Sequence, residues 1–225
     1  MNELDVIVSL TTWEKRIALK ELPRVLYRLL TQETQYNYKV VLVLSSEELG
    51  NDYKLPHELE VMQRHPRFEI LWTYKNTRAL KKLDPTMKKY PETPIITMDD
   101  DMLLKKNAIQ MVMDEFKEHP KCISGTIYGA PNGVTRVGGL RIYPPHSLAD
   151  FDLKYFQQYF KMMVDDEWNG LRAKAAKTAL RKLNCKPVES ITYGDQKTRF
   201  SKEYTRMKTR LAVSKFRREH RELGV

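Results

Sequence analysis

Three consecutive carboxylates, Asp99, Asp100 and Asp101, give this sequence its clearest chemical signal. They directly follow the apolar run formed by residues 94–98. Adjacent carboxylates repel one another, and a bound divalent cation such as Mg²⁺ or Mn²⁺ removes that repulsion while gaining the oxygen ligands that it prefers. A cation held by one or two carboxylates, with its other positions taken by water and phosphate oxygens, is the usual partner of a diphosphate. The alternative is an acidic turn before a helix that begins near Asn107.

A second acidic pair, Asp165 and Asp166, lies in the segment VDDEW at residues 164–168. A carboxylate within hydrogen-bond reach can take the proton of an attacking hydroxyl group. Trp168 adds a flat apolar face two residues after this pair. The alternative is an acidic first turn for a following helix, where the helix dipole favours negative charge.

Alternating strands and helices position both motifs. Apolar runs rich in Val and Ile predict strands, and apolar side chains at helical spacing predict helices. The predicted strands cover residues 4–10, 39–44, 68–73, 94–98 and 121–126, and the predicted helices cover residues 22–30, 55–65, 77–90 and 107–119. This alternation predicts an α/β fold, a three-layer sandwich around a largely parallel, twisted, Rossmann-like sheet. Ligands bind such sheets outside the carboxyl ends of the strands, where Asp99 to Asp101 fall.

The remainder of the chain changes character. The segment from 127 to 146 is rich in Gly and Pro and is predicted to be mostly loop, with a strand at 140–143. After it, apolar spacing predicts helices over 151–163, 171–183 and 201–223. We therefore expect a catalytic α/β domain over 1–170. A basic helical C-terminal extension over 171–225 would either belong to the same compact unit or face a membrane.

Positive charge is concentrated in that extension. Residues 1–170 carry 23 Lys/Arg and 24 Asp/Glu, whereas residues 171–225 carry 16 and 5, so the two parts have net charges of −1 and +11. A basic segment attracts phospholipid headgroups or nucleic acid, unless it is simply a solvated helix. We expect residues 197–225 to contact an anionic membrane surface and expect no nucleic acid, because the sheet-forming part has no positive excess. The apolar side chains that would assist membrane contact are Tyr204, Met207, Leu211 and Phe216.

The sequence contains few features that indicate a cellular compartment. The two cysteines, Cys122 and Cys185, fit neither a disulfide framework nor a zinc site. The N-terminal residues lack the basic region and long apolar run of a secretory signal, and no stretch is long and apolar enough to span a bilayer. These features predict a cytoplasmic protein, peripheral on the inner membrane face.

Three segments taken together resemble bacterial glycosyltransferases of the GT-A fold, in particular enzymes of surface-polysaccharide synthesis. They are VSLTTWEKRI at 8–17, ALKKLDPTMKKYPETPIITMDDDM at 79–102 and VDDEW at 164–168. The resemblance covers residues 4–170. An Asp-x-Asp pattern alone is weak, but its place after an apolar strand, behind a Lys-Lys-Leu segment, makes it more specific.

The resemblance implies roles for the first acidic motif and for the loop after the first strand. Asp101 would be the main ligand of Mn²⁺ or Mg²⁺, Asp99 would face the donor ribose and join the metal shell, and Asp100 would steady the site. The loop would grip the base and ribose of the donor nucleotide through Leu10, Thr11, Thr12 and Arg16. A simple turn is the alternative for the two threonines.

Lysine and glycine residues also receive roles from the resemblance. Lys81 or Lys82 would meet the donor diphosphate or base, as an ammonium group suits phosphate, whereas a solvated lysine pair is the ordinary alternative. Gly133, Gly138 and Gly139 would form a flexible loop between donor and acceptor, and Gly138 and Gly139 with Trp168 would contact the acceptor. An ordinary cluster of turns is the alternative for the glycines.

The reaction that the resemblance implies is an inverting sugar transfer. The donor would be a nucleotide diphospho-sugar with uridine as its nucleoside, the acceptor a saccharide or a lipid-linked molecule, and Asp166 the base, supported by Asp165. Many relatives supply a metal-ligating histidine after the second acidic motif, but no histidine lies between His146 and His220 here. Water and phosphates would then complete the metal shell, unless His220 folds back.

Other functions remain open. A Mg²⁺-dependent nucleotidyltransferase or phosphohydrolase would also use clustered aspartates at a strand end, although the sequence contains neither a P-loop nor a nucleophile-elbow motif. A basic nucleic-acid-binding protein and a non-catalytic relative of the glycosyltransferases are further alternatives.

Overall fold

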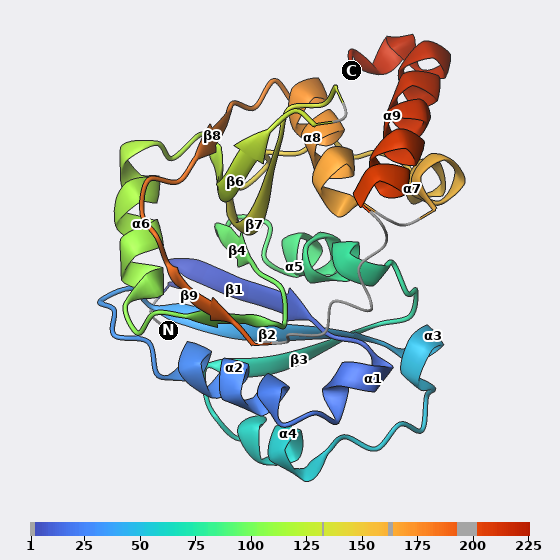
Figure 1. Ribbon diagram of the computed structural model, residues 1–225. Helices are drawn as coiled ribbons and strands as arrows, with labels where there is room; N and C mark the ends of the chain where they lie inside the picture. The colour runs from blue at the N-terminus through green and yellow to red at the C-terminus, as the bar shows by residue number, and fades with distance from the viewer. Residues whose placement is uncertain (1–2, 132, 162–163, 193–201) are drawn as a thin grey trace.

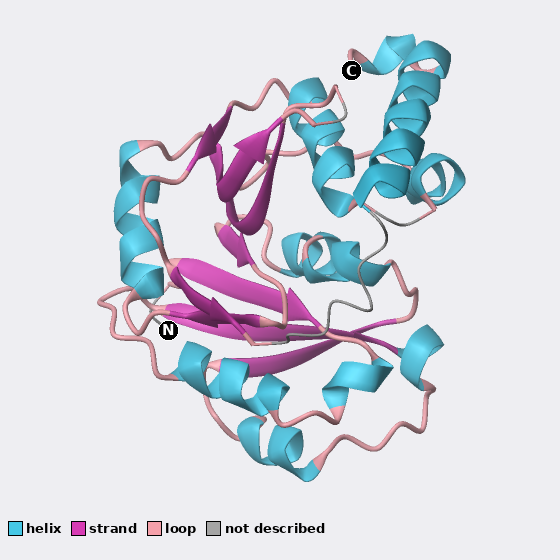
Figure 2. Ribbon diagram, in the orientation of Figure 1, coloured by secondary structure: helices cyan, strands magenta, loops and turns pink. Residues whose placement is uncertain are grey.

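A computed structural model of the chain describes residues 3–131, 133–161, 164–192 and 202–225. Within these residues, a seven-stranded sheet lies between layers of helices, as Figures 1 and 2 show, and its strand order is β3-β2-β1-β4-β7-β6-β8. The strands are β1 Val6–Thr11, β2 Tyr38–Ser45, β3 Phe68–Thr73, β4 Ile95–Thr97, β6 Ile123–Gly129, β7 Arg136–Tyr143 and β8 Leu180–Lys182. Among the described pairings of this sheet, β7 is antiparallel to both of its neighbours and the other pairs are parallel. The prediction of a largely parallel, Rossmann-like α/β sheet is confirmed.

Helices cover the sheet and connect its strands. They are α1 Glu14–Ile17, α2 Glu21–Leu30, α3 Ser46–Leu49, α4 His57–Met62, α5 Asp84–Lys89, α6 Ala108–Glu118, α7 Leu153–Phe160, α8 Asp165–Ala175 and α9 Lys202–Glu219, with 3-10 turns η1 Arg78–Lys82 and η3 Arg221–Leu223. A small second sheet pairs β5 Met102–Leu104 with β9 Val188–Ile191 in antiparallel fashion. None of the helices in the described part of the chain combines the length and the apolar content that crossing a membrane requires.

Strict alternation of side chains divides the apolar residues of the central strands between two cores. Val40, Leu42 and Leu44 of β2 pack on one face with the apolar stripe of α2, whereas Val41 and Val43 pack on the opposite face. Strands buried on both faces read as continuous apolar runs, because each successive side chain enters one core or the other. The sequence pattern therefore predicts these strands well.

Two predictions of secondary structure are wrong. The predicted helix over 171–183 is instead the end of α8, a left-handed turn at Lys177 and the strand β8. Residues 180–182 extend because they pair in parallel with the edge of β6, a tertiary interaction that local spacing does not reveal. The predicted loop over 127–146 is largely a β-hairpin, in which β7 begins at Arg136 rather than at 140. Helix α8 also continues through residue 170, the predicted domain boundary.

The basic C-terminal helix packs on the rest of the protein through an aromatic cluster. This cluster consists of Phe151, Phe156, Phe160, Trp168 and Phe216. Phe216 of α9 is fully buried within it, so the prediction that Phe216 contacts a membrane is wrong. Figure 1 shows α9 against α7 and α8 at one end of the molecule. The side chain of Tyr204 lies outside the described residues.

Replacing Phe216 by Ala tests this packing of α9. Removing a fully buried aromatic ring from a closed cluster is expected to lower the free energy of unfolding by about 3–5 kcal/mol. Leu211→Ala, on the exposed side of the same helix, is the matched control and is expected to change it by less than about 0.5 kcal/mol. Urea unfolding followed by circular dichroism measures both. Equal stability of the two variants would show that α9 is not part of the core.

Candidate active site

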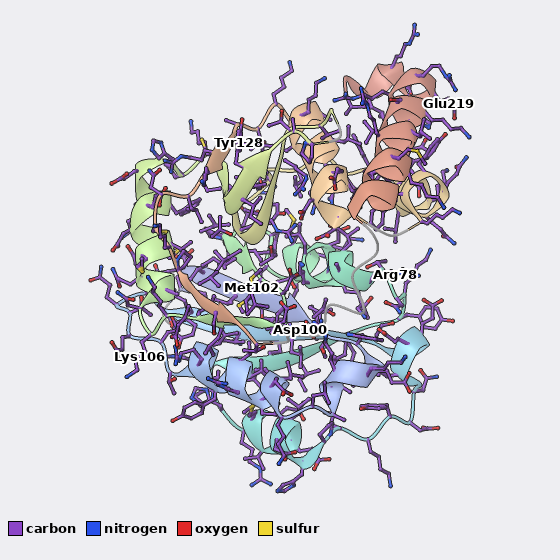
Figure 3. The ribbon with its side chains drawn as sticks, in the orientation of Figure 1. Arg78, Asp100, Met102, Lys106, Tyr128 and Glu219 are labelled. Carbon is purple, nitrogen blue, oxygen red and sulfur yellow. The ribbon has the colours of Figure 1, made fainter. Side chains whose placement is uncertain are left out.

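The loop after β1 and the acidic motif after β4 meet at the point where the strand order of the sheet reverses. β1 lies between β2 and β4, and Ser9 pairs with Thr97, so Thr11 and Asp99 each stand two residues beyond that pair at the carboxyl edge. Ligands of open α/β sheets bind at this reversal point. Figure 3 shows Asp100 beside the central strands, among closely packed side chains.

Asp100 joins the loop after β1 to the acidic motif after β4. Its two carboxylate oxygens accept hydrogen bonds from Thr12 Oγ1 at 2.7 Å and from Arg16 Nη1 at 2.6 Å. The Asp100 side chain is buried, so these two donors replace the water that it loses. Thr11 faces another way and donates its hydroxyl hydrogen to the carbonyl oxygen of Val43 at 2.7 Å.

Asp101 is the least compensated carboxylate of the motif. Its nearest described cation is Arg16, whose Nη1 lies 3.6 Å from Asp101 Oδ2. Burial and the charges of Asp99 and Asp100 raise the pKa of Asp101 above its usual value, because they outweigh Arg16. The backbone of Asp101 is fixed by Thr192, which donates from N at 2.7 Å and from Oγ1 at 3.1 Å to its carbonyl oxygen. The negative charge of Asp101 is therefore only partly compensated, and hydrogen bonds hold the backbone that carries it in place.

Lys82 connects the two acidic motifs. Its side chain is 2% exposed, and its Nζ lies 2.5 Å from Asp99 Oδ1 and 3.6 Å from Asp165 Oδ2. Burial disfavours the ammonium form, but Asp99 and Asp165 outweigh burial and raise the pKa of Lys82. The neighbouring Lys81 is also buried and forms an ion pair with Glu48. The two lysines are thus not a solvated pair, since each ammonium group lies beside a carboxylate. That one of them meets the donor remains a prediction.

Two arginines of β7 complete the connection, and the sequence analysis missed both. Arg141 is buried, and its Nη1 lies 3.1 Å from Asp165 Oδ2 and 2.6 Å from Asp166 Oδ1. Arg136 Nη1 lies 2.6 Å from Asp166 Oδ2, and its Nε lies 3.0 Å from Glu167 Oε1. Asp99, Lys82, Asp165, Arg141, Asp166 and Arg136 therefore form an alternating series of charges, called here the charged network.

The charged network shifts the pKa values of the adjacent residues Asp165 and Asp166 in opposite directions. Burial favours the neutral acid in both, but Lys82 and Arg141 overcome it and lower the pKa of Asp165 to about 2. At Asp166, burial together with the charge of Asp165 prevails over Arg141 and raises the pKa. Opposite shifts in neighbouring carboxyls are typical of catalytic acid–base sites. Each oxygen of Asp166 accepts one arginine contact and retains a lone pair for another donor.

A glycine bulge aims both arginines at Asp166. Arg141 is five positions after Arg136, so regular alternation would place them on opposite faces of β7. The register between β6 and β7 shifts between Gly125 and Ile127, and Gly139 has φ +69° at that point. The extra residue of the bulge returns Arg141 to the face of Arg136. A positive charge inside the apolar segment LRIY was the available sequence signal for Arg141.

The surroundings predicted for Trp168, Gly138 and Gly139 are wrong. Trp168 is 1% exposed and lies inside the aromatic cluster, so it offers no face to a sugar ring. Gly138 and Gly139 belong to β7 rather than to a flexible loop. A Cβ atom at Gly138 would lie 2.6 Å from Asp166 Oδ2, and one at Gly139 would lie 2.3 Å from Thr126 Oγ1. These glycines make room for the site itself, while Gly133 remains in the turn before β7.

The side chains of Leu10 and His220 also make their contacts outside the candidate site. The Leu10 side chain is fully buried in the core below the site, so only its backbone is available to a nucleotide. The ring nitrogens of His220 lie 3.2 Å from Tyr159 Oη and 3.1 Å from Glu222 Oε1. Neither ring nitrogen is free for a metal.

The acidic residues fit a cation only as part of a mixed shell. No group of three His, Cys, Asp or Glu side chains in the described part of the chain converges to hold a metal. Asp99 faces Lys82 and Asp100 faces Arg16, which leaves Asp101 with its excess charge and the half-exposed Asp99 close by. One or two carboxylates fit Mg²⁺ or Mn²⁺ when water and phosphate oxygens supply the other ligands.

Comparison with known proteins supports the fold. No protein-family model matches the sequence, and no curated protein matches it significantly. Among solved structures, S. aureus TarS 1–349 in complex with UDP-GlcNAc has a TM-score of 0.58 at 11% identity, over 95% of this chain and 67% of that one. A mannosyltransferase, PcManGT from Pyrobaculum calidifontis in complex with GDP-Man and Mn²⁺, has a TM-score of 0.53 at 10% identity, over 79% and 54%. TarS 1–349 alone has a TM-score of 0.53 at 14% identity, and the chain spans 59% of its length. The chain shares the Rossmann-like α/β fold of these GT-A neighbours, as predicted.

Replacing Arg141 by Gln tests the charged network. The change leaves Asp165 and Asp166 buried with less compensation, so we expect the free energy of unfolding to fall by about 3–5 kcal/mol at neutral pH. Arg218→Gln is the matched control, because Arg218 pairs with Glu219 at the surface, and its cost is expected to stay below about 1 kcal/mol. Urea unfolding gives both values. Similar losses in the two variants would refute a structural role of Arg141 in compensating Asp165 and Asp166.

Proposed function

We propose that the protein is a metal-dependent glycosyltransferase that transfers a sugar from a nucleotide diphospho-sugar, with UDP as the nucleotide, to a saccharide or lipid-linked acceptor. The observation that carries the proposal is the connection of the two acidic motifs by Lys82, with Arg141 bound to the second of them, beside the point of strand reversal. The solved neighbours with nucleotide-sugars in their complexes support the same class. A role in surface-polysaccharide synthesis is part of the proposal.

The donor would lie along the carboxyl edge of β1 and β4. The nucleoside would contact the loop of Thr11, Thr12 and Arg16, and the half-exposed Asp99 would accept hydrogen bonds from the ribose. Asp101, with Asp99 beside it, would hold Mn²⁺ or Mg²⁺, which supplies Lewis-acid stabilisation of the charge on the departing nucleoside diphosphate. Arg16, between Asp100 and Asp101, would keep the loop and the acidic motif in register.

Asp166 would act as the base of an inverting transfer. Its raised pKa favours proton acceptance, and each of its oxygens keeps a lone pair beyond the arginine contacts. Asp165, with its pKa of about 2, would stay ionised and hold Lys82 and Arg141 in place. The acceptor hydroxyl would lose its proton to Asp166 while it attacks the anomeric carbon from the face opposite the nucleotide.

The outer face of α9 would hold the enzyme on an anionic membrane surface. Met207 and Leu211 are 57% and 64% exposed, although Phe216 on the opposite face of the helix is buried. Exposed basic residues flank these two side chains: Lys208, Arg210, Lys215 and Arg218. Apolar side chains between cationic ones suit the boundary between acyl chains and acidic headgroups, whereas nucleic-acid phosphates would leave the apolar pair unused.

Two variants assayed side by side test the proposed reaction. Asp101→Asn removes charge at the metal position, so the thermal stabilisation by UDP-sugars that requires Mn²⁺ is expected to disappear. Asp166→Asn is expected to retain this stabilisation but to lose about 10²–10⁴-fold in transfer rate. Release of a nucleoside diphosphate identifies sugar transfer, whereas release of pyrophosphate would identify a nucleotidyltransferase. Full activity of Asp166→Asn, or no response of the parent protein to any nucleotide-sugar with metal, would contradict the proposal.

Charge reversal on α9 tests membrane contact. Each basic residue near an anionic surface contributes about 1 kcal/mol, so the double variant Lys208→Glu/Lys215→Glu is expected to bind phosphatidylglycerol-containing vesicles at least ~30-fold more weakly. The control Lys106→Glu/Lys186→Glu changes the same net charge outside α9 and is expected to bind as the parent does. Co-sedimentation with mixed phosphatidylcholine–phosphatidylglycerol vesicles measures the affinity. Equal losses in both double variants, or binding of duplex DNA in preference to vesicles, would refute this contact surface.

A further inference from the structure

A basic cleft lies outside the charged network, at the outer end of the β6–β7 hairpin. Its volume is about 510 Å³, within the range of small-molecule sites. The hairpin, the second half of α8, β8 and α9 all contribute to its wall, and Figure 3 shows Tyr128 at this end of the molecule. The lining residues are Tyr128, Gly133, Val134, Thr135, Gly170, Lys174, Thr178, Leu180 and Arg217.

The charges of the cleft have one sign. Lys174 and Arg217 are its two cationic residues, and no carboxylate occurs among the lining residues that the structure describes. Arg217 Nη1 donates to the carbonyl oxygen of Gly133 at 2.8 Å, which fixes the guanidinium group against the hairpin. Its Nε is buried and has no hydrogen-bond partner among the described atoms. A guanidinium group carries five N–H donors, so one that is fixed by a single hydrogen bond keeps further donors for an anionic oxygen.

The uncharged part of the lining suits a sugar. Tyr128 is 49% exposed and presents an aromatic surface at the wall of the cleft. Thr135 and Thr178 add hydroxyl groups that can donate or accept hydrogen bonds, as sugar hydroxyls require. Few polar groups around a partly apolar surface are the usual composition of a site for a small ligand.

Helix α8 connects the cleft to the charged network. Asp166, Gly170 and Lys174 follow one another at intervals of four residues, so they lie along one face of the helix. Gly170 lets the hairpin approach this face, since a Cβ atom there would lie 2.5 Å from the carbonyl oxygen of Thr135. At 1.5 Å of rise per residue, Lys174 stands roughly 12 Å along the helix from Asp166, and the hairpin covers the face between them.

We propose that this cleft binds an anionic saccharide, a sugar that carries a phosphate or carboxylate group, through Lys174 and Arg217. That the bound saccharide is the charged part of the acceptor rests on the proposed function, whereas the binding of an anionic saccharide to the cleft does not. A charged group of the acceptor, remote from its reacting hydroxyl group, would then be held in the cleft. Specificity for charged acceptors would come from these two cations rather than from the charged network.

Titration of the ¹⁵N-labelled protein, followed by backbone amide chemical shifts, tests this proposal. The probes are glucose 6-phosphate, glucuronate, glucose and inorganic phosphate, which separate the phosphate, the carboxylate, the neutral sugar and the bare anion. We expect shifts at Thr135 and Lys174, and at least ~10-fold tighter binding of a charged sugar than of glucose, as one charge-assisted hydrogen bond provides. Inorganic phosphate is expected to bind more weakly than glucose 6-phosphate, because it makes no contact with Tyr128.

Variants of exposed lysines keep the test independent of folding. Lys174→Gln is expected to weaken binding of the charged sugars about tenfold, Lys174→Arg to restore it, and Lys177→Gln, a nearby exposed lysine outside the cleft, to leave it unchanged. Thermal stabilisation by UDP-sugar with Mn²⁺ should be equal in the Lys174 variants and the parent. If charged sugars bind at the cleft while no nucleotide-sugar binds, the proposed function fails and this site stands. Shifts confined to other residues, equal affinity for glucose, or unchanged binding in Lys174→Gln would overturn it.

Discussion

The burial of Lys82 and Arg141 is the constraint on which the rest of this structure depends. Two cationic side chains lie almost entirely out of water, and each is compensated by two carboxylates. An unpaired charge in such a position would cost several kcal/mol, so the acidic motifs must approach them in the folded protein. The carboxyl end of β4 and the first turn of α8, far apart in sequence, are therefore joined by electrostatic contacts. Any substrate bound between the two motifs meets a geometry that exists before it arrives.

The fold could be predicted from the sequence because its information is local. Strand β2 is an apolar run because both of its faces are buried, and α2 shows its buried stripe at helical spacing. The acidic motif after β4 was likewise predictable, since a carboxyl end of a buried strand is the place where α/β proteins bind ligands. These inferences need only the periodicity of side chains and the direction of parallel strands.

The partners of the acidic motifs were not predictable, because they depend on tertiary detail. Arg136 and Arg141 share a face only through the bulge at Gly139, and one residue more or less in that hairpin would point Arg141 away from Asp166. Trp168 is on the helix that carries Asp165 and Asp166, but helical rotation turns it into the aromatic cluster while Asp166 faces β7. Residues that are adjacent in a motif thus have unrelated environments. The assignment of Trp168 to the acceptor, made from the motif alone, did not take this into account.

The charge balance of the site explains why a cation is proposed beside Asp101. The ion pairs between described residues connect six carboxylates, those of Asp99, Asp100, Asp101, Asp165, Asp166 and Glu167, with four cationic groups, those of Arg16, Lys82, Arg136 and Arg141. Six negative and four positive charges leave a surplus of two negative charges, which equals the charge of one divalent cation. Asp101 has only the 3.6 Å contact with Arg16, so part of the surplus falls at Asp101, where the pKa is raised. A diphosphate alone would increase the repulsion at that position, whereas a diphosphate that arrives with Mn²⁺ or Mg²⁺ would be attracted to it.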